Sequence, residues 1–110
     1  MIPLWTTLAQ YGVSIAIAGH DHIYERFEPL DVDGRPDAGG IRQFVVGTGG
    51  ASRYTIERVL PGSEARSSDA FGVLKLSLLS DRYRWEFVPV ERDGFRDRGE
   101  APCHRTHVAR

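Results

Sequence analysis

The apolar residues at the beginning of the chain are spaced as on one face of a helix. They are Leu4, Trp5, Leu8 and Tyr11. Pro3 suits a first helical position and Gly12 suits a C-terminal cap. The pattern predicts a short amphipathic helix that ends before residue 13.

The rest of the chain predicts strands. Residues 13–18 form a nearly continuous apolar run rich in β-branched side chains, which is typical of a strand covered on both faces. Residues 23–28 and 41–46 read as two further strands on either side of the turn-rich segment 31–40, and we expect a hairpin to close there.

The clearest hairpin lies further along. Residues 71–79 place Leu74, Leu76 and Leu78 on one face, and after a turn at residues 80–81 the aromatic residues alternate in the same way. These aromatic residues are Tyr83, Trp85 and Phe87. Residues 51–70 and the charged segment from 91 onward show no periodicity, and we expect a long loop and an irregular tail.

The fold class is therefore α/β and mostly β, with about five strands and one short helix. A strand covered on both faces needs a layer on each side of its sheet, and a single helix cannot supply the second layer. Either preceding sequence or a partner provides that layer, or the fold is atypical.

Composition and charge narrow the function classes. The chain has 110 residues, of which 41% are apolar and 26% charged, so it has room for one soluble domain. Its net charge of −1 and dispersed arginines argue against nucleic acid as a partner. We also expect no membrane partner, because no apolar run is long enough to span a bilayer. The single cysteine, Cys103, excludes an intrachain disulfide and a multi-cysteine zinc site.

Candidate chemistry is concentrated in a short segment after the first strand. His20 and His22 flank Asp21 just past the carboxyl end of that strand, where open α/β sheets usually bind ligands. Imidazole is a common ligand for zinc, iron and manganese, and a carboxylate between two such rings can orient them. A His-x-His pair in a loop is, however, more often not a metal site, and two imidazoles are too few for a complete one.

The longer string Gly19 to Phe27 resembles the G-H-x-H-x-Y-E-R motif of purple-acid-phosphatase-like members of the calcineurin-like metallophosphoesterases. Flanking segments resemble the same group at residues 3–5, 44–50 and 103–104. The resemblance implies that residues 1–90 are the C-terminal part of the family's α/β sandwich and that residues 91–110 are a charged tail. It leaves the compartment open, with a lean toward an exported or periplasmic location.

The resemblance also implies a two-metal site. His20 would bind one metal ion and His22 the other, with Fe, Zn or Mn as the ions of the complete domain. Asp21, Tyr24 and Arg26 would support the ligands from a second shell or serve the structure alone. The reaction implied is hydrolysis of a phosphate ester by a metal-bound hydroxide.

The family's other metal motifs, D-x-H, G-D and G-N-H, do not occur in this chain, which contains no asparagine. We therefore assign it no catalytic residue, expect it to be inactive by itself, and expect the N-terminal half of the domain to supply the remaining ligands. The alternative is a non-catalytic, β-rich remnant that binds one metal or serves in interactions, and a third possibility is a chain that is unstable alone.

The glycine-rich residues 47–50 read as a turn near the site rather than a phosphate cradle. We give no role to His104 and His107.

Overall fold

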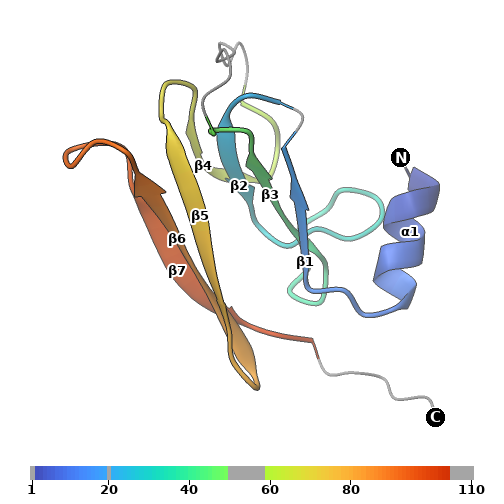
Figure 1. Cartoon of the computed structure of the whole chain (residues 1–110). Helices are drawn as coiled ribbons and strands as arrows, with labels where there is room; N and C mark the ends of the chain where they lie inside the picture. The colour runs from blue at the N-terminus through green and yellow to red at the C-terminus, as the bar shows by residue number, and fades with distance from the viewer. Residues whose placement is uncertain (1, 20, 50–58, 105–110) are drawn as a thin grey trace.

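The computed structural model describes residues 2–19, 21–49 and 59–104. Within them the chain forms two sheets, seven strands and one helix (Figure 1). The elements are α1 (Ile2–Gln10), β1 (Ile15–Ala18), β2 (Tyr24–Phe27), β3 (Arg42–Val46), β4 (Ser63–Ser67), β5 (Gly72–Leu78), β6 (Arg82–Pro89) and β7 (Asp97–Pro102). A mostly β chain with one short helix is confirmed, and the expected five strands are too few.

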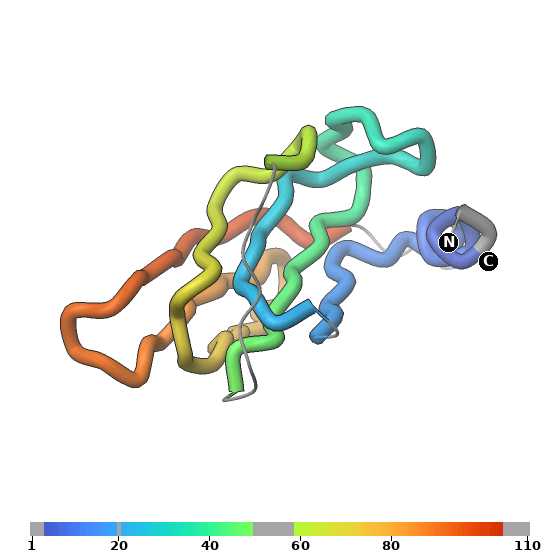
Figure 2. Tube along the Cα trace, turned by 90° about the horizontal axis from the view of Figure 1, so that it is seen from above, coloured from blue at the N-terminus to red at the C-terminus, as the bar shows by residue number. Residues whose placement is uncertain are grey.

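Helix α1 ends as its sequence predicts. Gly12 adopts a φ of 72°, which costs glycine little because it has no Cβ. The N–H of Gly12 donates to the carbonyl of Ala9 at 3.1 Å and that of Val13 to Leu8 at 3.2 Å. These two bonds form a Schellman cap, which satisfies carbonyls that the last helical turn leaves without partners. The helix lies beyond β1 at one edge of the molecule, as Figures 1 and 2 show.

The first sheet has the order β1-β3-β2-β4. β1 runs parallel to β3, and β2 runs antiparallel to both β3 and β4. The expected pairing of segments 23–28 and 41–46 is confirmed, with Tyr24 opposite Val46. Because β1 and β3 are parallel, their carboxyl ends meet at one edge of the sheet, and β2 begins at that same edge.

The second sheet has the order β5-β6-β7, and the expected hairpin is its β5–β6 pair, with Leu76 opposite Trp85. Two sequence expectations fail. β4 lies inside the segment expected to be a long loop, and β7 lies inside the expected irregular tail. The residues of both strands are mainly polar and do not alternate with apolar residues. These segments therefore become strands because they pair with β2 and β6, and not because of their own pattern.

Aromatic side chains fill the space between the two sheets. The core comprises Tyr24, Phe44, Ala70, Tyr83, Trp85 and Phe87. The rings of Tyr24 and Phe87 are 4.8 Å apart, and those of Phe44 and Trp85 meet edge to face at 5.6 Å. Since each ring comes from a different position on facing strands, this contact layer fixes how the sheets stack.

β1 differs from its expectation. The run of apolar residues predicts a strand covered on both faces, but Ile17 is 55% exposed and Ala18 is also exposed. β1 is an edge strand of the first sheet, and the described residues place no strand on its outer edge. Leu4 of α1, at 54% exposure, is likewise uncovered. The second layer that the sequence requires is thus not supplied by the described part of the chain. No helix in that part is long and apolar enough to span a membrane.

Gly99 of β7 generates a stability prediction. It lies opposite Trp85, and a Cβ at Gly99 would stand 2.5 Å from Cζ2 of that indole. Gly99→Ala should displace the buried ring and lower the free energy of unfolding by about 1–3 kcal/mol in urea denaturation. Gly39→Ala is the control, because its Cβ would lie 3.5 Å from the nearest atom, an ordinary contact. Equal midpoints for the two variants would contradict the packing.

Candidate functional site

The loop that carries the His-x-His motif, residues 19–23, connects β1 to β2 at the carboxyl edge of the first sheet. His20 lies outside the described residues. Asp21 is exposed to solvent and His22 is half-buried. The sequence therefore placed the motif loop at the correct edge of the sheet.

Gly47, the first residue after β3, is in close contact with this loop. Its N–H donates to the carbonyl of Ile23 at 3.0 Å, and the N–H of Ile23 donates to the carbonyl of Asp21 at 2.9 Å. A Cβ at Gly47 would lie only 2.1 Å from the carbonyl oxygen of Asp21 and 2.8 Å from that of Gly19. Because the Gly47 N–H is already donated to Ile23, it is not available to a phosphate, which favours the turn over the phosphate cradle.

Thr48 joins the same segment to the second sheet. Its side chain is buried, and its hydroxyl donates to the carbonyl of Gly72 at 2.9 Å. In return the N–H of Gly72 donates to the carbonyl of Thr48 at 3.0 Å. The segment after β3 is thus bonded to the motif loop on one side and to the start of β5 on the other.

Tyr24 and Arg26 point into the space between the sheets, where both contact Asp97 of β7. The Tyr24 hydroxyl donates to Oδ2 of Asp97 at 2.5 Å. Arg26 donates through Nε to Oδ2 at 2.8 Å and through Nη2 to Oδ1 at 3.1 Å. The contact is a bidentate guanidinium–carboxylate pair, the geometry that gives such pairs their strength and orientation. A second-shell role for the two residues stays a prediction.

A second arginine completes this cluster. The guanidinium carbons of Arg26 and Arg42 lie 5.0 and 4.7 Å from the centre of the Trp85 ring. Glu64 of β4 accepts hydrogen bonds from both arginines, with Arg42 Nη1 at 2.8 Å. Two cations and two carboxylates therefore balance in charge around one indole. Glu64 itself is exposed to solvent, and the balance makes the burial of the other three groups tolerable.

The pKa values of the cluster follow from these contacts. Burial raises the pKa of the Tyr24 phenol far above its usual value, and its hydrogen bond to Asp97 raises it further. Burial by itself would raise the pKa of Asp97, but the hydrogen bonds from Arg26 and Tyr24 outweigh it, and the pKa is lowered. For Arg26, burial would lower the pKa, yet Asp97 and Glu64 raise it. Tyr24 thus stays a donor while Asp97 and Arg26 stay charged.

Sequence reasoning missed Asp97. It lies in the segment expected to be an irregular tail, 71 residues from Arg26. Most of residues 91–100 are charged, so nothing in the neighbouring sequence indicates that this acidic side chain lies between the sheets. Only the pairing of β7 with β6, which places Asp97 opposite Phe87, brings it between the sheets.

The described residues do not assemble a metal centre. Among residues 2–19, 21–49 and 59–104, no three His, Cys, Asp or Glu side chains gather closely enough to hold an ion. His104, which has no assigned role, lies with its Nε2 2.6 Å from the carbonyl oxygen of Gly40. Its backbone N–H donates to Ser14 Oγ at 2.8 Å, so it ties the end of β7 to the start of β1. His107 lies outside the described residues.

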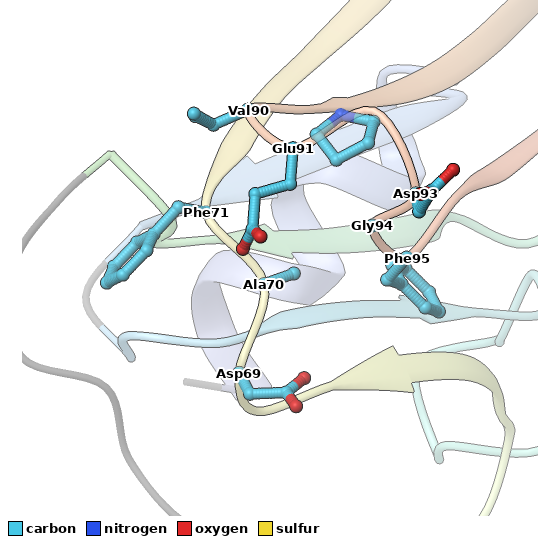
Figure 3. Close-up of a pocket in the computed structure, with 9 residues that line it drawn as sticks. Asp69, Ala70, Phe71, Val90, Glu91, Asp93, Gly94 and Phe95 are labelled. Carbon is cyan, nitrogen blue, oxygen red and sulfur yellow. The ribbon is translucent and has the colours of Figure 1, made fainter.

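A separate cavity of about 340 Å³ opens between the segment before β5 and the β6–β7 turn (Figure 3). Its lining includes the carboxylates of Asp69, Glu91 and Asp93. Three negative groups would repel an anionic phosphate ester, so this cavity is not suited to the substrate that the motif implies.

A scan against protein-family models, a search of curated proteins and a search of solved structures each find no match to this chain.

The cluster formed by Tyr24, Arg26, Arg42, Glu64 and Asp97 around Trp85 leads to a prediction for a substitution. Asp97→Asn keeps the shape of the side chain but removes the more buried of the two carboxylates that pair with Arg26, and it should lower the free energy of unfolding by about 2 kcal/mol. Glu100→Gln, which breaks the exposed pair with Arg84, serves as the control and should leave the urea midpoint nearly unchanged. Similar midpoints for the two variants would show that the Arg26–Asp97 pair does not hold the sheets together.

The lowered pKa of Asp97 predicts how the free energy of unfolding changes with pH. The pKa of Asp97 is lower in the folded than in the unfolded chain, where it is about 3.9. Its contribution is therefore present above about pH 4 and is lost as the pH falls through the folded-state pKa. The difference in unfolding free energy between wild type and Asp97→Asn should be constant from pH 5 to 7 and shrink below pH 4. A difference that grows as the pH falls would contradict this assignment.

Proposed function

We propose that this chain is the C-terminal part of a two-metal phosphoesterase domain, in which His20 and His22 each bind one metal ion. The observation that supports it most is local. The G-H-x-H-x-Y-E-R-like string begins at the carboxyl end of β1, beside its parallel neighbour β3, and its loop is held there by Gly47. That edge is where α/β sheets bind ligands.

The residues of the string divide into two groups. The first group lies in the loop, where the described residues Asp21 and His22 follow the carboxyl end of β1. Tyr24 and Arg26 belong to β2 and bind Asp97, which fixes the strand that directly follows the loop. When bound, ions such as Fe, Zn or Mn would polarise a phosphate ester and lower the pKa of water. In this proposal the chain supplies two metal ligands, His20 and His22, from the loop after β1.

The remaining ligands must come from outside the described residues. In the proposal they belong to the N-terminal half of the domain, which would also cover the outer edge of β1 and the exposed Ile17. The substrate is a phosphate ester, with no nucleic acid or membrane as partner. A second candidate is a non-catalytic β-rich remnant. It is favoured because the part of the chain that the structure describes brings no three possible metal ligands together.

Zinc binding tests the proposal. In calorimetric titrations with ZnCl₂, His22→Ala should raise the dissociation constant at least about tenfold for one of the two ions, because that ion loses its imidazole ligand. His107→Ala removes an imidazole outside the motif and is the matched control. Circular dichroism confirms that both variants fold. Equal affinities for the two variants would remove the support for a metal site in this loop.

Turnover tests whether this chain is catalytic by itself, which neither candidate expects. The purified chain, supplied with Zn²⁺, Mn²⁺ or Fe³⁺, should release no phosphate from an aryl phosphate, because the described residues lack a full ligand set. Metal-dependent release that His20→Ala abolishes would rule out the non-catalytic remnant. It would also overturn the proposal that the other ligands lie in another part of the domain.

A further inference from the structure

We propose that Gly47 is a positioning residue for the metal-binding loop, through the close approach of its backbone to residues 19–23. The inference rests on the proposed function for the role of the histidines as metal ligands. The contact between Gly47 and the loop rests on the geometry of the backbone. Three carbonyl groups of the loop surround Gly47: those of Gly19, Asp21 and Ile23. They alternate with His20 and His22 along the chain.

The requirement for glycine at this position is steric. A Cβ there would come within 2.1 Å of the Asp21 carbonyl oxygen and 2.8 Å of the Gly19 carbonyl oxygen. Both are backbone atoms, so no side-chain rotation can relieve the overlap. Left-handed backbone conformation is not the reason, since the glycines with positive φ are Gly12, Gly34 and Gly62 among the described residues.

The contact also holds the loop by a hydrogen bond. The Gly47 N–H donates to Ile23 O at 3.0 Å, directly after His22. The loop is therefore hydrogen-bonded at Ile23 to the residue that follows β3, and it lies close to the same residue at Gly19 and Asp21. Because imidazole ligands bind metal best when their direction is set beforehand, a fixed backbone on either side of His22 favours metal binding by its imidazole.

The position of Gly47 is itself fixed from the second sheet. Thr48, the next residue, is buried and exchanges two hydrogen bonds with Gly72 at the start of β5. A path of backbone contacts thus runs from β5 through Thr48 and Gly47 to the motif loop. The glycine-rich segment after β3, which the sequence suggested as a turn or a phosphate cradle, has a defined use on this path.

Two glycine-to-alanine variants test the inference. Gly47→Ala introduces the overlap, and Gly49→Ala is the matched control, because a Cβ at Gly49 meets nothing within 4 Å. In ¹⁵N-resolved NMR spectra, Gly47→Ala should move the amide resonances of Asp21, His22 and Ile23. It should weaken Zn²⁺ binding by about tenfold or more. Amide protection in the β5–β6 hairpin should stay as in the wild type, which excludes a general loss of structure. Gly49→Ala should change neither readout.

The outcomes separate this inference from the proposed function. If the wild-type chain does not bind Zn²⁺, the proposed metal site fails, while the amide resonances of residues 21–23 still decide whether Gly47 positions the loop. Unchanged loop resonances in Gly47→Ala, or equal effects of the two substitutions, would overturn the positioning role.

A measurement on the wild type covers the case in which Gly47→Ala does not fold. Saturating Zn²⁺ should slow hydrogen exchange of the Gly47 amide, whose acceptor is Ile23 of the loop, more than that of the Gly49 amide. Equal slowing at both amides would overturn the inference.

Discussion

The guanidinium of Arg26 and the carboxylate of Asp97 meet in the space between the two sheets. Aromatic packing and further hydrogen bonds, from Thr48 to Gly72 and from Arg42 to Tyr83, also join the sheets. Two hydrogen bonds, at 2.8 and 3.1 Å, fix both their separation and their orientation. The pair would be costly to bury without partners, and Tyr24, Glu64 and the face of Trp85 supply them. One polar contact thus sets how β2 of the first sheet faces β7 of the second.

That constraint reaches the motif loop because β2 starts only two residues after His22. With Tyr24 and Arg26 held by Asp97, the end of the loop has a fixed position relative to the second sheet. Its beginning is fixed by β1 and by the approach of Gly47 to the carbonyls of Gly19 and Asp21. The string that resembles a metallophosphoesterase motif therefore combines a loop that carries the proposed metal ligands and a strand that contacts the second sheet.

Much of the fold could be predicted from local pattern. The helix with its Gly12 cap, the pairing of residues 23–28 with 41–46 and the β5–β6 hairpin each have apolar spacing or turn chemistry that indicates them. β4 and β7 could not be predicted, because their residues are polar and only pairing with β2 and β6 makes them strands. The burial of β1 was overestimated, since its apolar run indicates a cover that the described residues do not supply.

In the candidate site, too, some residues could be predicted from local sequence and others depend on distant segments. A sequence string is enough to single out His20, Asp21 and His22, because ligand chemistry is a property of the residues themselves. The partner of Tyr24 and Arg26 could not be found in this way, since Asp97 is distant in sequence and lies among other charges. The need for glycine at position 47 could not be found either, because it arises from carbonyls on another segment.

Anomalous diffraction from crystals of the chain soaked in ZnCl₂ tests the central claim most directly. We predict an anomalous peak beside the motif loop, with an imidazole nitrogen of His22 at about 2.0–2.1 Å from the ion. Zinc bound only elsewhere, or a His22 ring that points away from the ion into the interior, would contradict it.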